Sequence, residues 1–150
     1  KRAKTSRFGN LEGFSKTATG IAVQWEQWAA NFLGGIWVNE EIMSQPYDLK
    51  LGNFNIDVKV SNLFVRKKKR NTTWNGDGCW TFKPNEIFKP QIHYYLCICL
   101  EKDIVKKVLL IPSKIYHLTK GISVGRKSKY NLYNIYTNEI HFRGNRLEWL

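Results

Sequence analysis

Acidic residues are scarce in this chain. Its 150 residues include 12 aspartates and glutamates against 24 lysines and arginines, which gives a formal net charge of +12. So large a positive surplus on a small protein favours a polyanionic partner, most often nucleic acid. A merely basic protein, or one that binds a membrane surface, is the alternative. The charge therefore indicates a class of partner without identifying a reaction.

Long apolar runs and an even set of cysteines are also lacking. No apolar stretch is long enough to cross a bilayer, and the first ten residues, KRAKTSRFGN, lack the apolar segment of a secretory signal. The chain has three cysteines, Cys79, Cys97 and Cys99, at spacings that suit neither a disulfide framework nor a zinc site. We expect reduced thiols in an intracellular protein with no membrane contact, in the cytoplasm or nucleoid if the source is bacterial.

What the chain does contain is enough apolar and aromatic material for a core. Hydrophobic residues make up 43% of it and aromatic residues 14%, which excludes a disordered chain. We expect a single domain over residues 1–150, with a basic lead-in or arm over residues 1–19. The stretch 83–92 leaves room for only a short helix.

Helical spacing begins at Gly20 and ends before the glycines that follow Leu33. Glu26 falls at the border of the apolar arc of this helix. Alternating and continuous apolar patterns then predict strands. The fold class we expect is α/β, a mixed β-sheet with flanking helices. The apolar arc comprises Trp28, Ile21, Phe32, Trp25, Ala29, Ala22 and Leu33, and the strands cover 47–51, 54–61, 79–82, 94–100 and 105–111.

The stretch YDLKLGNFNIDVKVS contains a hairpin whose geometry follows from its turn. Gly-Asn at positions 52 and 53 suits a two-residue loop, so Leu51 faces Phe54 and Leu49 faces Ile56. In this register the apolar residues share one face of the hairpin. The other face then places two aspartates directly opposite each other.

These aspartates, Asp48 and Asp57, are like charges at adjacent cross-strand positions, which is destabilising without a compensating partner. A divalent cation is the simplest partner, because hard oxygen ligands at this separation can share Mg²⁺. Lys59 projects on the same face as Asp57, two residues along the strand. The alternative is a solvated acidic pair flanked by lysines.

The order of a helix bearing Glu26, then PYD at 46–48, then IDVK at 56–59, resembles the PD-(D/E)xK nuclease superfamily. This superfamily includes restriction enzymes, Holliday junction resolvases and group I intron homing endonucleases. The resemblance implies a restriction-endonuclease-like core. It covers residues 20–61 strongly and the strands to about 113 weakly, in the loose sense of pattern matching. One departure is Tyr47, which separates the proline from the first aspartate.

The resemblance also implies roles for these residues. Asp48 and Asp57 would hold Mg²⁺ with the backbone carbonyl of Val58, and Lys59 would orient or activate the attacking water. Glu26 would position water or a second Mg²⁺ ion from the helix side. The catalytic residues implied are therefore Glu26, Asp48, Asp57 and Lys59.

Two basic clusters are candidates for contacts with DNA phosphates. Each could instead be a solvated loop, and the first could be a targeting signal. Trp74 is a candidate for stacking on a base. The first cluster contains Arg66, Lys67, Lys68, Lys69 and Arg70, and the second contains Arg126, Lys127 and Lys129.

Together these features favour a site-specific, Mg²⁺-dependent endonuclease that acts on double-stranded DNA, of the homing or restriction type. A Holliday junction resolvase and a non-catalytic nucleic-acid-binding module remain the alternatives. Cutting both strands requires two active sites, so we expect a homodimer or homotetramer.

Overall fold

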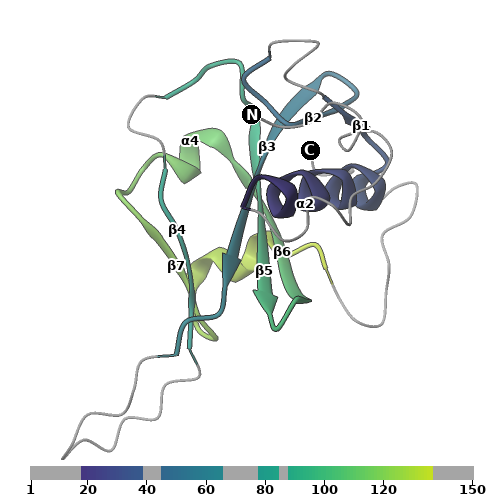
Figure 1. Cartoon of the computed structure of the whole chain (residues 1–150). Helices are drawn as coiled ribbons and strands as arrows, with labels where there is room; N and C mark the ends of the chain where they lie inside the picture. The colour runs from purple at the N-terminus through teal and green to yellow at the C-terminus, as the bar shows by residue number, and fades with distance from the viewer. Residues whose placement is uncertain (1–17, 39–44, 66–77, 85–87, 137–150) are drawn as a thin grey trace, which may run out of the picture.

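The computed structural model describes residues 18–38, 45–65, 78–84 and 88–136. A five-stranded sheet in the order β1-β2-β3-β5-β6 forms the centre of the fold, beside a two-stranded sheet of β4 and β7 (Figure 1). Strand β3 runs parallel to β5, and the other neighbours are antiparallel. The predicted mixed α/β sheet is therefore confirmed. The elements are α2 (Ala18–Leu33), β1 (Ile36–Trp37), β2 (Leu49–Leu51), β3 (Phe54–Asn62), β4 (Trp80–Phe82), β5 (Tyr94–Glu101), β6 (Ile104–Pro112), α4 (Ser113–Tyr116), β7 (Ile122–Val124) and the 3-10 helix η2 (Lys129–Tyr133).

Helix α2 packs against one face of the large sheet (Figure 1). Trp25, Ala29 and Leu33 are buried, as their spacing predicts, and Val23 and Ala30 are buried as well. Ile21 and Ala22 were expected in the apolar arc, but both are exposed. They lie near the start of the helix, where they line a cleft instead of the core. The helix ends at Leu33 as predicted, because Gly34 takes a positive φ of +75°.

Strand β5 lies between two hydrophobic cores because its side chains alternate between the two faces of the sheet. Leu96, Ile98 and Leu100 join the core beneath α2. Tyr95, Cys97 and Cys99 join the opposite core, which β4, β7, α4 and η2 cover. The continuous apolar run therefore forms a strand buried on both faces, as the sequence predicts.

The β2–β3 hairpin has the predicted register. Leu49 pairs with Ile56 and Leu51 with Phe54, and Gly52 begins the turn with φ +58°, which a two-residue hairpin loop favours. The ladder is shorter than predicted, because β2 begins only at Leu49. Asp48 therefore precedes the strand, and its backbone N–H donates to the carbonyl of Ile56 (3.0 Å).

Several predicted features are only partly visible or fall outside the described ranges. Most of the basic lead-in lies outside them, as do the cluster at 66–70 and Trp74. In the part of 83–92 that the structure describes, the chain forms turns and no helix. Within the same ranges, no helix combines the length and apolar character that a membrane crossing requires. All three cysteines are free.

Candidate active site

Asp48 is held at the start of β2 by its neighbours on both sides. Its carbonyl accepts a hydrogen bond from the N–H of Val38 (2.8 Å), and its side-chain Oδ2 accepts one from the N–H of Val58 (2.7 Å). The carboxylate thus takes the place that a backbone acceptor of a longer β2 would occupy. Asp48 is 6% exposed, so its position is fixed by backbone bonds and by burial together.

Asp57 lies on β3 and is also buried, with 8% of its surface exposed. Its Oδ2 lies 3.0 Å from the ammonium nitrogen of Lys59, two residues along the same strand. That oxygen accepts no hydrogen bond from the part of the chain that the structure describes. Within the described residues, this buried oxygen is therefore compensated by the charge of Lys59 alone.

The backbone of β3 is open beside these side chains. β2 pairs only with Phe54–Ile56, whereas β5 pairs with Ile56–Asn62. In a strand the N–H and C=O of one residue point toward the same edge. The N–H of Val58 points toward Asp48, so the carbonyl of Val58 points to that edge as well. This is the position that the sequence resemblance implies for a backbone metal ligand.

Glu26 approaches this edge from helix α2. It lines a cleft of about 380 Å³ with Lys59, Val58 and Val60. Its Oε1 accepts a hydrogen bond from Nε1 of Trp37 on β1 (3.1 Å). Glu26 is also close enough to Asp48 to raise the pKa of that carboxyl group. The structure thus brings Glu26, Asp48, Asp57 and Lys59 to one region of the molecule.

The electrostatics of the pair follow from burial and from like charges. Desolvation of Asp48, together with the negative charges of Asp57 and Glu26, raises the pKa of the Asp48 carboxyl from 3.8 to about 9. The hydrogen bond from Val58 opposes this shift. In the protein without a metal ion, Asp48 therefore holds a proton at neutral pH.

These residues fit a Mg²⁺ ion. Within the described ranges, no three side chains of His, Cys, Asp or Glu are grouped closely enough to hold a metal by themselves. Mg²⁺ does not need such a cage, because it usually binds one or two carboxylates and completes its shell with water and substrate phosphate. The two buried carboxyl groups, one with an oxygen that accepts no hydrogen bond within the described residues, suit a hard cation at this edge.

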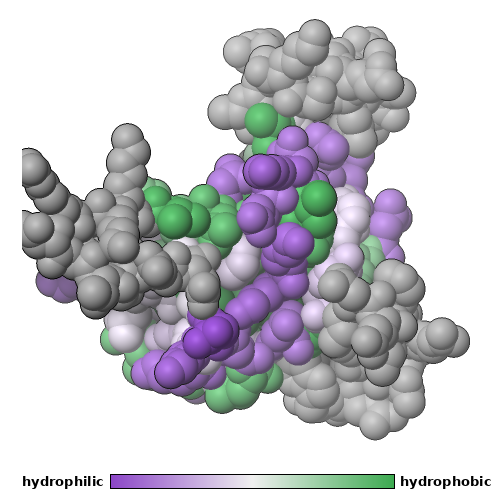
Figure 2. Space-filling model, turned by 90° about the horizontal axis from the view of Figure 1, so that it is seen from below, coloured by the Kyte–Doolittle hydropathy of each residue, from purple (hydrophilic) through white to green (hydrophobic). Residues whose placement is uncertain are grey.

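The remaining predicted contacts are only partly placed. Arg126, Lys127 and Lys129 are exposed in and beside the segment that leads into η2. Figure 2 shows one face of the molecule with a band of hydrophilic side chains between apolar ones. Because its side chains are exposed, the second basic cluster is accessible to a polyanion, whereas the cluster at 66–70 is not described.

Sequence reasoning missed two parts of this region. The cleft also involves Ile21, Ala22 and Asn62. The hydrogen bond from Trp37 to Glu26 joins two different elements, so no pattern within either element predicts it. Exposed apolar residues on a helix carry no signal of a cleft until the facing strand is placed. The missed features therefore depend on how α2 packs against β3.

Comparison with known proteins gave a similarity of fold. No protein-family model matches the chain, and no curated protein matches its sequence. Among solved structures, the fold is similar to that of "a bacterial homing endonuclease", I-Ssp6803I, with a TM-score of 0.49 and 15% sequence identity. The match covers 76% of this chain and 81% of the other. The similarity is one of fold alone and assigns no activity.

Proposed function

We propose that this chain is a Mg²⁺-dependent endonuclease that hydrolyses phosphodiester bonds in double-stranded DNA. One observation carries the proposal: two buried aspartates converge at an open strand edge, with Lys59 paired to one of them. Burying two carboxyl groups side by side, so that one must take up a proton, is costly in a protein that makes no use of them. The net charge of +12 supports a DNA substrate.

Each residue has a role that its position suits. Asp48 and Asp57 would hold the ion with the Val58 carbonyl, and the ion would supply positive charge beside the scissile phosphate. Lys59 orients the attacking water beside Asp57, to which its ammonium group is already paired. Glu26 positions water, or a second Mg²⁺ ion, from the opposite wall of the cleft.

The test is cleavage of supercoiled plasmid and of a random-sequence duplex library with Mg²⁺ or with chelator. We expect Asp57→Asn and Lys59→Ala each to slow cleavage by at least about 100-fold, while salt-dependent DNA binding persists. Matched controls are Asp103→Asn in the β5–β6 turn and Lys50→Ala on β2, both exposed. If wild type cuts nothing, or if the two site variants cut as fast as the controls, the proposal is wrong.

The same assay separates the related activities. A homing or restriction enzyme linearises duplex containing its target, and a junction resolvase instead cuts a four-way junction in preference to the matching duplex. We expect linear product and a homodimer or homotetramer, since one protomer offers one such site. Sedimentation of the protein on a cleaved duplex measures the stoichiometry.

A further inference from the structure

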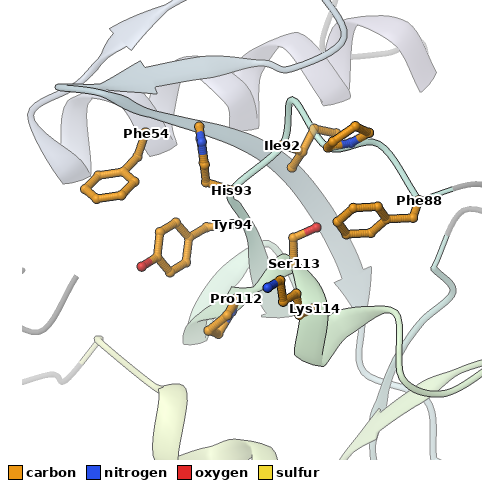
Figure 3. A pocket seen from close by; sticks show the side chains of 9 residues that line it. Phe54, Phe88, Ile92, His93, Tyr94, Pro112, Ser113 and Lys114 are labelled. Atoms are coloured by element: carbon orange, nitrogen blue, oxygen red, sulfur yellow. The ribbon is translucent and has the colours of Figure 1, made fainter.

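A second pocket lies at one end of the sheet and is lined by residues other than those of the cleft beside Glu26. It has a volume of about 260 Å³ and forms where β3 and β5 begin and β6 ends. Figure 3 shows its side chains, with Phe54 and Tyr94 on one side and Phe88 on the other. This volume is just below the usual range of about 300–1,000 Å³ for ligand pockets in proteins. The pocket therefore suits one planar ring system rather than a large ligand.

The aromatic walls are held by contacts between rings. Phe54 packs edge-on against Tyr94 and against His93, with ring centroids 5.5 and 5.7 Å apart. Phe88 packs edge-on against His117 at 5.3 Å and is 44% exposed. Planar ligands such as nucleobases stack on side chains of this kind, whatever the base. The walls thus favour an aromatic ligand.

A buried hydroxyl group in the pocket has no hydrogen-bond partner among the residues that the structure describes. Ser113 is 4% exposed, and its Oγ makes no hydrogen bond within the described residues. Its backbone N–H donates to the carbonyl of His93 (2.9 Å), which fixes the residue. A buried hydroxyl without a partner is costly, so most such groups are satisfied by protein, water or ligand. A polar ring edge would satisfy this one.

His93 adds a donor of known position. Its Nδ1 accepts the backbone N–H of Asn55 (2.9 Å). In the neutral ring the proton is therefore on Nε2, which becomes a donor. His93 is exposed, and the ammonium group of Lys114 is a second donor at the pocket. The pocket thus offers two hydrogen-bond donors, from His93 and Lys114, and the Ser113 hydroxyl, which can also accept. The edge of a nucleobase likewise carries both donors and acceptors.

A lysine-lined cleft adjoins the pocket. Phe88 lines both, and the second cleft, of about 700 Å³, also includes Lys83, His117 and Lys120. A ring pocket beside a positively charged cleft suits a nucleotide chain, whose bases are planar and whose phosphates are anionic. An isolated aromatic metabolite would make no use of the second cleft. Charge complementarity therefore selects nucleic acid as the occupant.

The pocket is close to the acidic pair along the strand. Phe54 precedes Asp57 by three residues, about 10 Å at the usual rise of a strand. Tyr94 pairs with Ile56, immediately before Asp57. This separation is spanned by a few nucleotides of bound strand, at 3.4 Å of rise per step in duplex DNA.

We propose that this pocket binds a single unstacked nucleobase of the DNA strand held by the protein, with Phe88 and Tyr94 as stacking surfaces and Ser113 as a hydrogen-bonding group. The proposal rests on the DNA-cleaving function proposed above for the choice of ligand, but not on catalysis. An extruded base is recognised through its polar edge and by stacking between aromatic side chains.

The test compares two single-stranded probes, a thymidine octanucleotide and an octamer of abasic sites with the same phosphates. We expect wild type to bind the thymidine probe more tightly in fluorescence anisotropy. Phe88→Ala should lower that preference about tenfold, and Ser113→Ala about threefold, because stacking contributes more than one neutral hydrogen bond. The abasic probe should bind both variants as it binds wild type.

The matched control is Phe64→Ala, which removes a phenylalanine that is 59% exposed and lies outside the pocket. It should keep the full preference, and the conservative variant Phe88→Trp should restore what Phe88→Ala loses. The proposal is overturned if wild type shows no preference, or if the pocket variants weaken both probes equally.

A second measurement locates the base directly in the wild-type protein. An oligonucleotide with one 5-iodouracil is crosslinked by light, and the modified peptide is identified by mass spectrometry. We expect attachment at Phe88, Tyr94 or Phe54, and attachment only elsewhere overturns the proposal. Plasmid nicking by wild type and the same variants distinguishes the two proposals. If wild type prefers the thymidine probe but does not cut plasmid, only the nuclease proposal is wrong. If wild type cuts plasmid but shows no preference for the thymidine probe, only the pocket proposal is wrong.

Discussion

The two halves of strand β3 differ in what lies beside them. In the closed half, Phe54–Ile56, β2 pairs on one side, and β5 pairs with Ile56 on the other. In the open half, Asp57–Asn62, only β5 pairs among the described strands. The closed half contributes Ile56 to the core, whereas the open half begins with the buried charge of Asp57. The difference shows that the candidate site forms where a neighbouring strand ends and backbone becomes available.

The largest expected contrast is in stability. Ile56→Ala in the closed half should lower the free energy of unfolding by about 2–5 kcal/mol, because it leaves a cavity in a fully buried site. Val60→Ala in the open half should cost only about 1 kcal/mol, because Val60 is half-buried. Urea unfolding measures both. Equal losses would show that the two halves are equally packed.

A smaller contrast concerns charge and pH in the metal-free protein. Asp48 has a pKa of about 9 when folded and an ordinary value of 3.8. Between these values unfolding releases a proton, so rising pH destabilises the folded protein through this group. Asp48→Asn keeps an acceptor for the Val58 N–H and removes the effect. It should stabilise the protein clearly at pH 8 and far less at pH 4.

Thermal melting in chelator across this pH range checks the sign. A stability difference that does not grow with pH, or a variant less stable than wild type at pH 8, would contradict the electrostatic account of the pair.

Binding of Mg²⁺ should offset the destabilisation that the buried aspartates cause in the open half of β3. Mg²⁺ at ten times its dissociation constant should stabilise wild type by about 1.4 kcal/mol, because it binds only the folded site. Asp57→Asn should lose this shift, and Asp103→Asn should keep it. The readout is the melting temperature with and without Mg²⁺. An equal shift in both variants would place the ion elsewhere.

The smallest expected effect concerns the Gly-Asn turn, which sets the register between β2 and the closed half of β3. Gly52→Ala should cost about 1 kcal/mol, since φ of +58° disfavours a side chain even where space is free. Lys102, at φ 52° in the β5–β6 turn, is the matched control. Lys102→Gly should leave stability unchanged or raise it. If Gly52→Ala melts as wild type, the turn does not constrain the hairpin.

Local patterns were enough for much of the fold. The alternation of Leu49, Leu51, Phe54 and Ile56 around a Gly-Asn turn predicted the register, since only one register gives an apolar face. The apolar run of β5 predicted a strand buried on both sides. The short elements β7, α4 and η2 were not predicted, because so few residues carry little periodic signal.

The candidate site was predicted only in its local part. Asp48, Asp57 and Lys59 are neighbours through the hairpin, so their proximity follows from a turn and a period of two. Glu26 reaches the site through packing of α2 on the sheet, and the helix phase was partly wrong at Ile21 and Ala22. The pocket around Ser113 combines residues from β3, β5 and α4, and no local pattern joins them.

The sequence by itself determined the charge of the chain, the helix, the hairpin register and the placement of Lys59 beside Asp57. These depend on interactions between residues that are near one another along the chain. Only the tertiary structure decided that the pair is buried, that β2 stops at Leu49, and that Glu26 and the aromatic pocket lie near this edge. Burial and long-range packing depend on which distant surfaces meet, and those contacts are set by the whole fold.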